Sequence, residues 1–365
     1  MLKYIIRRSL QAIPVLFGIT VVCFMLMHLQ PGNPADRFAQ NPKITQAQIE
    51  AFKHRWGLDE PLPVQYCAWL GVCGDKGILN ALPGGNLNIA GVAIDLPGGD
   101  NGVLHGDFGY SIFDGQPVTT IIANRALPTV ILALSAYVIW ITIAFLAGVY
   151  AAVKRYGKFD STLTIFNYVG YSLPTFWLGL MLIAFLSVPP FKIFPASGMW
   201  DARTVPIFGT GDYWAFVGAN PITALVDLLR HLALPVLTLV LVSVAGDSRF
   251  IRSSMLDALN QDYVKTARAK GLPERSVVFR HALRNALLPV ITNVGLEIPF
   301  LFSGAIATET IFSWPGMGRQ FVESVGHNDY TVLMGILLIT SVIVVFANLL
   351  ADIMYAVVDP RVKYD

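Results

Sequence analysis

Long apolar segments, separated by polar loops, are the main feature of this chain. A helix needs about 20 apolar residues to cross a hydrocarbon core of about 30 Å. The segments that meet this length lie approximately at residues 11–29, 127–150, 162–188, 232–248, 286–307 and 331–352. The pattern therefore predicts an all-α integral membrane protein with six transmembrane helices.

Two of the six segments have a second interpretation. Lys3, Arg7 and Arg8 precede the first one, as in a signal peptide. The apolar run is long, however, and "LQPGNPAD" after it contains no small-x-small cleavage site, which favours a retained helix. In the fourth segment only about fifteen residues separate His231 from Asp247, so a short helix buried between other helices is the alternative to a span.

Proline residues interrupt three of the later segments, at Pro174, Pro235 and Pro299. Such residues kink helices where neighbouring groups satisfy the freed carbonyls. The kinks are either flex points for a conformational change or the ordinary occurrence of proline in membrane helices.

The spans divide the chain into four parts. In order, these are residues 1–29 with the first helix, a loop domain at 30–126 with a Gly-rich insertion at about 70–105, a core at 127–352 with helices two to six and a basic region at 249–285, and a tail at 353–365. Within the loop domain, Thr45 is suited to begin an amphipathic helix and Gly57 to end it. Alternating apolar residues then predict a small hairpin, at Leu87, Ile89, Val92 and Ile94.

Composition agrees with a membrane protein, since 54% of the residues are hydrophobic, 14% are charged and the mean hydropathy is +0.57. The net charge of +2 gives no indication of a nucleic-acid partner. If the N-terminus is cytoplasmic, the four inside segments hold three, three, eight and two of the 26 Lys and Arg residues. The longer outside loops hold fewer cations per residue, so the positive-inside rule places both termini in the cytoplasm and residues 30–126 outside it.

The basic region after the fourth segment predicts a pair of helices. Ser254 and Asp257 have the spacing of a capping box, so we expect a helix to begin there. One apolar face then recurs every three or four residues, at Leu256, Leu259, Tyr263 and Ala267. Gly271 is suited to end this helix, and Pro273 fits the first turn of a second one.

The bend between these two helices has small side chains, from which Lys265, Arg268 and Lys270 project. Small residues let another surface approach the backbone, which favours docking into the socket of a partner. The excess of cations equally favours contact with anionic membrane lipid. The residues of the bend alone leave both interpretations open.

The sequence carries no constellation for bond-making chemistry. It contains no GxxxxGK[ST] nucleotide loop, no HExxH, no paired Cys/His metal spacing and no GxSxG. We therefore expect neither an enzyme nor a chain that binds its own cofactor or metal. Cys67 and Cys73 form a disulfide if their loop faces an oxidising compartment, and are otherwise free thiols.

Glu297 is the carboxylate expected nearest the middle of a span. An ionised group at this depth costs at least about 2.5 kcal/mol, so it should face a wet cavity or a partner. We favour a residue that lines a translocation pathway, with a structural hydrogen bond to a neighbouring helix as the alternative. An ion-coupled secondary transporter that uses Glu297 as a relay is an alternative function. Asp247 and Asp352 lie near span ends, where helix packing or a salt bridge is expected.

Several stretches carry a family resemblance, among them "GDFGYS", "GYSLPTFWLGL", "SRFIRSSMLDALNQDYVKTARAKGL", "RHALRNALLPVIT" and "ETIFSWPGMGRQFVES". Through them the chain resembles the B-type inner-membrane permease subunit of peptide ABC importers. This family carries oligopeptides, dipeptides and, in some branches, nickel complexes. The insertion at about 70–105 lies outside the family pattern, and Lys265 and Thr266 stand where the general importer motif has Glu-Ala.

The resemblance implies the type I importer permease fold in a bacterial inner membrane, with defined partners. These are a second homologous permease, two cytoplasmic ATPases that hold ATP and Mg, and an extracytoplasmic substrate-binding protein that delivers peptide. It also implies that the bend is a coupling helix seated in the ATPase, formed by Lys265, Thr266, Ala267, Arg268, Ala269, Lys270, Gly271 and Leu272. Trp314, Pro315 and Gly316 would contact the binding protein, with membrane-interface anchoring by the Trp as the alternative.

Overall fold

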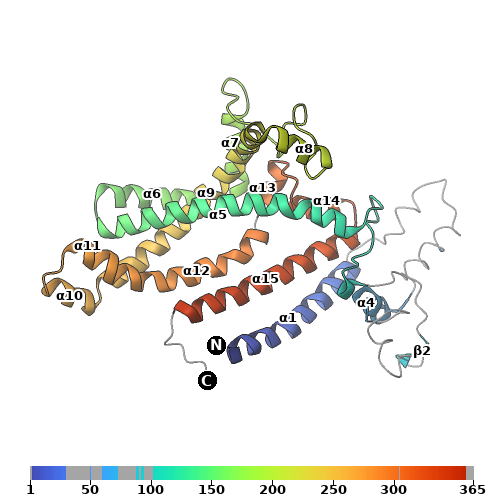
Figure 1. The fold of residues 1–365 in the computed structure, drawn as a ribbon, viewed down its shortest axis with the longest axis horizontal. Coiled ribbons are helices and arrows are strands. Elements are labelled where there is room, and N and C mark those ends of the chain that lie inside the picture. Colours follow the sequence, from blue (N-terminus) through green and yellow to red (C-terminus); the bar gives the residue numbers. More distant parts are fainter. Residues whose placement is uncertain are drawn as a thin grey trace. The chain divides into compact units, whose positions relative to one another are not determined.

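A computed structural model describes most of the chain as helices (Figure 1). The described residues are 2–29, 50, 60–72, 88–89, 92–93, 102–303 and 305–358. The helix predicted between Thr45 and Gly57, and Cys73, lie outside these ranges.

The helices divide into long and short ones. The long helices are α1 (Leu2–Leu29), α5 (Val118–Val153), α9 (Pro221–Leu259), α12 (Leu283–Ser303) and α15 (Tyr330–Val358). The shorter ones are α4 (Leu62–Leu70), α6 (Lys158–Ser172), α7 (Thr175–Leu186), α8 (Gly211–Ala219), α10 (Asp262–Ala269), α11 (Glu274–Ser276), α13 (Ile306–Ile311) and α14 (Met317–Gly326). A 3-10 turn, η1 (Val103–His105), and a π-helix, η2 (Val277–Ala282), complete the helical elements.

Four helices of the described chain are long and apolar enough to cross a membrane, namely Ile6–Met25 of α1, α5, α9 and Tyr330–Leu350 of α15. The pair α6 and α7 would make a fifth, although a bend of 102° separates its two helices. Pro174 lies at that bend as the N-cap of α7, where the sequence predicted a kink. The fifth predicted segment corresponds to α12, a helix of 21 residues.

Helix α9 corrects two predictions about the fourth segment. It runs for 39 residues without interruption, so the segment is neither short nor followed by a new helix at Ser254. The capping-box spacing failed because the apolar periodicity continues through it. Ile251, Met255 and Ala258 are buried at intervals of three and four residues, and their packing outweighs a local N-cap preference.

The chain forms two compact units. The first comprises Met1–Ala12, Ala126–Arg319 and Ile343–Asp365, and the second comprises Ile13–Arg125 and Gln320–Val342. The larger core of the first unit is built mainly from apolar residues of α5 and α9, and it includes Trp314. The core of the second unit contains Phe24 and residues of α15, with Tyr66 and Trp69 of α4 packed against them.

Two short strands lie in the region of the predicted hairpin. β1 (Asn88–Ile89) pairs antiparallel with β2 (Val92–Ala93), with Ile89 opposite Val92. The hairpin is thus confirmed for its described residues, whereas Leu87 and Ile94 lie outside them.

Candidate functional site

The basic bend, residues 262–276, consists of α10, a turn and α11 at one end of the first unit (Figure 1). Gly271 has φ +74°, a left-handed conformation that glycine adopts without a Cβ clash. The second helix begins directly after Pro273. The predicted arrangement of helix, turn and helix is therefore present, although its first helix begins at Asp262.

The apolar face of the bend differs by one residue from the predicted one. Val264 is fully buried and Ala267 is 5% exposed, whereas Tyr263 is 38% exposed. Buried side chains from the ends of α5, α9 and α12, from α10 and from η2 form one cluster, namely Ala152, Met255, Ala258, Val264, Ala267, Val277, Val278, Ala282 and Ala286. The bend is therefore packed onto the ends of three long helices, and displacing it would disturb all three.

Ion pairs within the bend engage two of its cations. Lys265 Nζ lies 2.8 Å from Asp262 Oδ1. Arg268 donates from Nη2 to Glu274 Oε1 at 2.7 Å and from Nε to Oε2 at 3.2 Å, so this pair bridges the turn between α10 and α11. The guanidinium of Arg268 lowers the pKa of the Glu274 carboxyl below its ordinary value. The exposed surface of the bend includes Thr266, Ala269 and Lys270.

A cavity of about 420 Å³ lies between helices of the first unit. Its walls come from α5, the bend between α6 and α7, α9, α12 and the start of α13. The lining residues are Ala133, Trp140, Tyr171, Thr175, Leu239, Val242, Ser243, Gly246, Asp247, Glu297, Ala305 and Ala307. Its walls are mainly apolar, and Asp247 and Glu297 are its acidic members.

The two carboxyl groups of the cavity are held by different partners. Trp140 Nε1 donates to Asp247 Oδ2 at 2.9 Å, and Asn293 Nδ2 donates to Glu297 Oε1 at 2.7 Å. Glu297 Oε2 is buried and has no hydrogen-bond partner among the residues that the structure describes. The Asp247 carboxyl is near enough to interact with Glu297 electrostatically.

Sequence reasoning did not place Asp247 at the cavity. The residue was expected near a span end, in packing or a salt bridge, and in the structure it accepts the Trp140 indole N–H and lines the cavity together with Glu297. Helix α9 continues past Asp247, as the helical period through Ile251 and Met255 indicates.

Trp314 and its neighbours are not the surface patch that was predicted. Trp314 is fully buried, and its Nε1 donates to the Pro128 carbonyl at 2.9 Å. Gly316 is also buried, and Pro315 is half-buried. The indole therefore has no exposed face for a binding protein or for the membrane interface, which corrects both interpretations of this residue.

Beneath this turn lies Glu309, a fully buried carboxylate that the sequence interpretation passed over. It accepts from Thr129 Oγ1 at 2.8 Å and from the Arg319 backbone N–H at 3.0 Å. A Cβ on Gly316 would overlap this carboxylate, which explains the glycine. An acidic residue followed by two glycines in "ETIFSWPGMG" is the signal for such a close approach.

Of the three cysteines, Cys67 is disulfide-bonded and Cys23 is free. Because Cys73 lies outside the described residues, the Cys67–Cys73 pairing stays a prediction. No group of three or more His, Cys, Asp or Glu residues suited to a metal ion occurs within the described ranges.

Long apolar helices that line a cavity, with a basic bend packed on their ends, fit a membrane-transport component. Residues 144–364 match the family described as "Binding-protein-dependent transport system inner membrane component". Residues 1–80 match the associated family "Binding-prot-dependent transport system membrane comp, N-term". The chain belongs to this family and is thus a multi-pass inner-membrane protein.

Relatives match along the whole chain. It is 40% identical over 365 residues to the oligopeptide transport system permease protein AppB of Bacillus subtilis, with 100% of each chain covered. It is 34% identical over 378 residues to the dipeptide transport system permease protein DppB of Escherichia coli K12, covering 100% of this chain and 99% of that one. The dipeptide permease protein of Alkalihalophilus pseudofirmus is 35% identical, with 100% of both chains covered.

Proposed function

We propose that this chain is the permease subunit of an ATP-driven peptide importer. The relatives that it matches along their full length are peptide permeases, at up to 40% identity. In this proposal it encloses the pathway with a second, homologous permease. Two cytoplasmic ATPases bind below them, and an extracytoplasmic binding protein delivers the peptide from above.

The finer membrane topology follows from the distribution of charge. The chain crosses the membrane six times, with α12 as the span that joins the four candidate helices and the α6–α7 pair. Both termini and the basic bend are then cytoplasmic, as the positive-inside rule requires. Residues 30–126 form the loop outside.

The observation that carries the proposal is the packing of the basic bend. Its buried cluster joins α10 to the ends of α9 and α12, and these two helices carry Asp247 and Glu297 of the cavity. A force applied to the exposed surface of the bend is therefore transmitted to both acidic walls. Residues 265–272 would form the coupling surface that the ATPase holds, with ATP and Mg bound by that partner and not by this chain.

The cavity supports a role in the pathway for peptides. A peptide with a free amino terminus is cationic, and two carboxyls in a mainly apolar cavity attract such a group. We assign Glu297 to the pathway, with Asp247 as its neighbour.

A cysteine crosslinking experiment tests the coupling surface. Ala269 is exposed on the bend, so Ala269→Cys in a chain that lacks Cys23 should crosslink to an ATPase subunit. Ala267→Cys, two residues away and buried, is the matched control and should not react. Ile207, 67% exposed in a loop assigned to the outside, should be labelled by a membrane-impermeant thiol reagent when it is replaced by Cys.

Two results would contradict the proposal. One is the failure of Ala269→Cys to capture a nucleotide-hydrolysing subunit in an assembled complex. The other is labelling of Ala269→Cys from the same side of the membrane as Ile207→Cys.

A further inference from the structure

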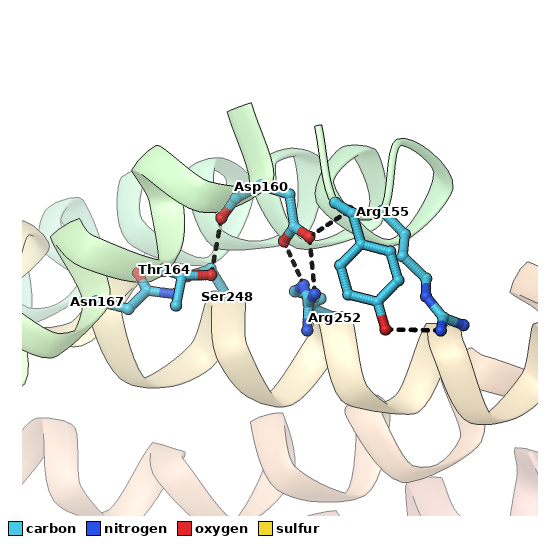
Figure 2. Close-up of polar contacts among 7 residues, drawn as sticks. Arg155, Asp160, Thr164, Asn167, Ser248 and Arg252 are labelled. Atoms are coloured by element: carbon cyan, nitrogen blue, oxygen red, sulfur yellow. Dashed lines mark hydrogen bonds and ion pairs between the residues drawn. The ribbon is translucent and has the colours of Figure 1, made fainter. Parts of the chain in front are cut away.

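Helices α6 and α9 are joined by polar contacts that the cavity and the bend do not explain (Figure 2). Arg252 donates from Nε to Asp160 Oδ1 at 2.5 Å and from Nη2 to Oδ2 at 2.8 Å. The Asp160 carboxylate is 3% exposed and also accepts the Tyr156 backbone N–H at 2.8 Å. The ion pair is therefore two-pronged, with a buried carboxylate and a guanidinium side chain that is 26% exposed.

Further contacts continue along both helices, and together with the ion pair they form a seam between α6 and α9. Ser248 Oγ donates to Asn167 Oδ1 at 3.0 Å, and both residues are buried. Beyond them, a Cβ on Gly170 would lie 3.0 Å from Ala245 Cβ, so the two helices approach closely there. From one contact to the next, the residue numbers rise along α6 and fall along α9, as expected for antiparallel helices.

The seam extends along α9 from the side of the basic bend to the level of the cavity. Arg252 lies toward the bend, and the cavity residue Asp247 lies between the seam residues Ala245 and Ser248. Along α6, the seam ends beside Tyr171, which lines the same cavity at the bend into α7. The α6 wall of the cavity therefore reaches the basic bend through its contacts with α9.

Buried ion pairs seldom add stability over apolar packing, because desolvation offsets their attraction, but removing one partner is costly. A two-pronged Arg–carboxylate pair instead fixes geometry, since the planar guanidinium matches one orientation of the carboxylate. The Asn167–Ser248 hydrogen bond and the close approach at Gly170 fix the same register. Sliding of α6 along α9 would break all three contacts together.

We propose that α6 and α9 move as one rigid body during transport, with Asp160 and Arg252 as the positioning residues that join them. This inference rests on the proposed coupling role of the basic bend. Through the seam, one movement of the bend displaces two walls of the cavity, one bearing Asp247 and the other Tyr171. Without the ion pair, the α6 wall no longer follows the bend.

The first test separates coupling from assembly. In proteoliposomes, Asp160→Asn should lower the amount of peptide transported per ATP hydrolysed by about fivefold or more, the lower range for coupling between distant sites. The ATPase should stay associated, as judged by the Ala269→Cys crosslink. An unchanged ratio of transport to hydrolysis would overturn the inference, whereas loss of the Ala269→Cys crosslink in the otherwise native complex would count against the proposed function.

The second test restores the seam covalently. Asn167→Cys with Ser248→Cys, in a chain that lacks Cys23, is joined by oxidation or by a one-carbon bis-methanethiosulfonate. In the Asp160→Asn background this crosslink should return the ratio of peptide transported to ATP hydrolysed to that of the native chain. The reduced sample is the matched control. Failure of the crosslink to rescue would mean that the unpaired Arg252 causes the defect, which contradicts the inference.

The same cysteine pair tests rigidity without any change at Asp160. If α6 and α9 move together, crosslinking Asn167→Cys to Ser248→Cys should leave ATP-driven uptake equal to that of the reduced sample. Loss of uptake on crosslinking would show that the helices must slide, and would overturn the inference even if Asp160→Asn does not fold.

Discussion

Among the acidic residues that the structure describes, Glu309 is the most completely buried, with 0% exposure. Its carboxylate accepts the Thr129 hydroxyl and the Arg319 backbone N–H. Thr129 Oγ1 in turn accepts the Met317 backbone N–H at 2.8 Å. One side chain thus orders the segment between α13 and the start of α14 and holds it to α5.

Replacing Glu309 with Gln should destabilise the protein. Gln has one acceptor oxygen where Glu has two, so either the Thr129 hydroxyl or the Arg319 N–H loses its partner, and leaving a buried donor unpaired costs about 1–3 kcal/mol. The midpoint of thermal unfolding in detergent should fall measurably. The matched control is Glu323→Gln, because Glu323 is partly exposed and lies 3.9 Å from Arg125, and such a pair is worth at most about 1 kcal/mol. Equal effects of the two substitutions would contradict the structural role of Glu309.

Glu297 should affect transport without affecting assembly. Replacing it with Gln keeps a group that can accept from Asn293 but removes one of the two carboxyl groups of the cavity. Uptake of peptides with a free amino terminus should fall about tenfold, which corresponds to ~1.4 kcal/mol of lost attraction. Uptake of N-acetylated peptides is the control and should change little. Loss of the assembled complex, measured by co-purification, would indicate a structural role instead.

At the scale of elements, the basic bend depends on one glycine in a conformation that other residues rarely adopt. Replacing Gly271 with Ala should cost about 1 kcal/mol, because φ +74° brings a Cβ into contact with the backbone. Gly218→Ala in α8 is the matched control, since a Cβ there meets nothing within 4 Å, and Ala favours a helix by up to about 1 kcal/mol. Thermal unfolding should therefore shift in opposite directions for the two variants. A shift in the same direction would contradict the assigned turn.

The helices and turns were predictable wherever the preferences of the local residues agreed with the way the helices pack. Gly271 and Pro273 marked the turn, and Pro174 marked the bend between α6 and α7, because these residues act through backbone geometry. Ser254 misled, since side-chain burial on α9 outweighed a cap preference. The π-helix η2 was not predicted at all, because a widened turn is set by the helices packed around it and carries no distinct residue pattern.

The candidate site was predictable in part for a similar reason. Glu297 was found because placing a carboxylate within an apolar segment costs free energy, so its presence there indicates a role. Asp247 and Arg252 were assigned to span ends or to loop charge, since pairing across helices depends on register that no local pattern encodes. Trp314 was placed on an outside surface because the family resemblance implied a contact there, but tertiary packing buries it.

At the scale of the whole molecule, the exposed apolar residues of α5, such as Leu134 and Leu146, need lipid or a partner helix to cover them. The family is a component of a larger transport system, which agrees with this surface. The chain is thus expected to function only within a complex.

Native mass spectrometry of the purified complex tests its composition. We expect one copy of this chain, one copy of a different but homologous permease and two ATPase subunits, because the two permeases enclose a single pathway. An intact complex with two copies of this chain and no second permease would contradict the proposal. Removing the ATPases by mild detergent dissociation should leave the permease pair together, which serves as the control for specific association.

The hydrogen bond from Trp140 to Asp247 gives the cavity an optical reporter. The indole is 8% exposed, and its N–H is committed to a carboxylate on the cavity wall. A cationic cargo that engages Asp247 would change the polarity around the indole and so shift its fluorescence emission. With the other six of the seven tryptophans replaced by Phe, the arrival of cargo would be visible in real time without any attached dye.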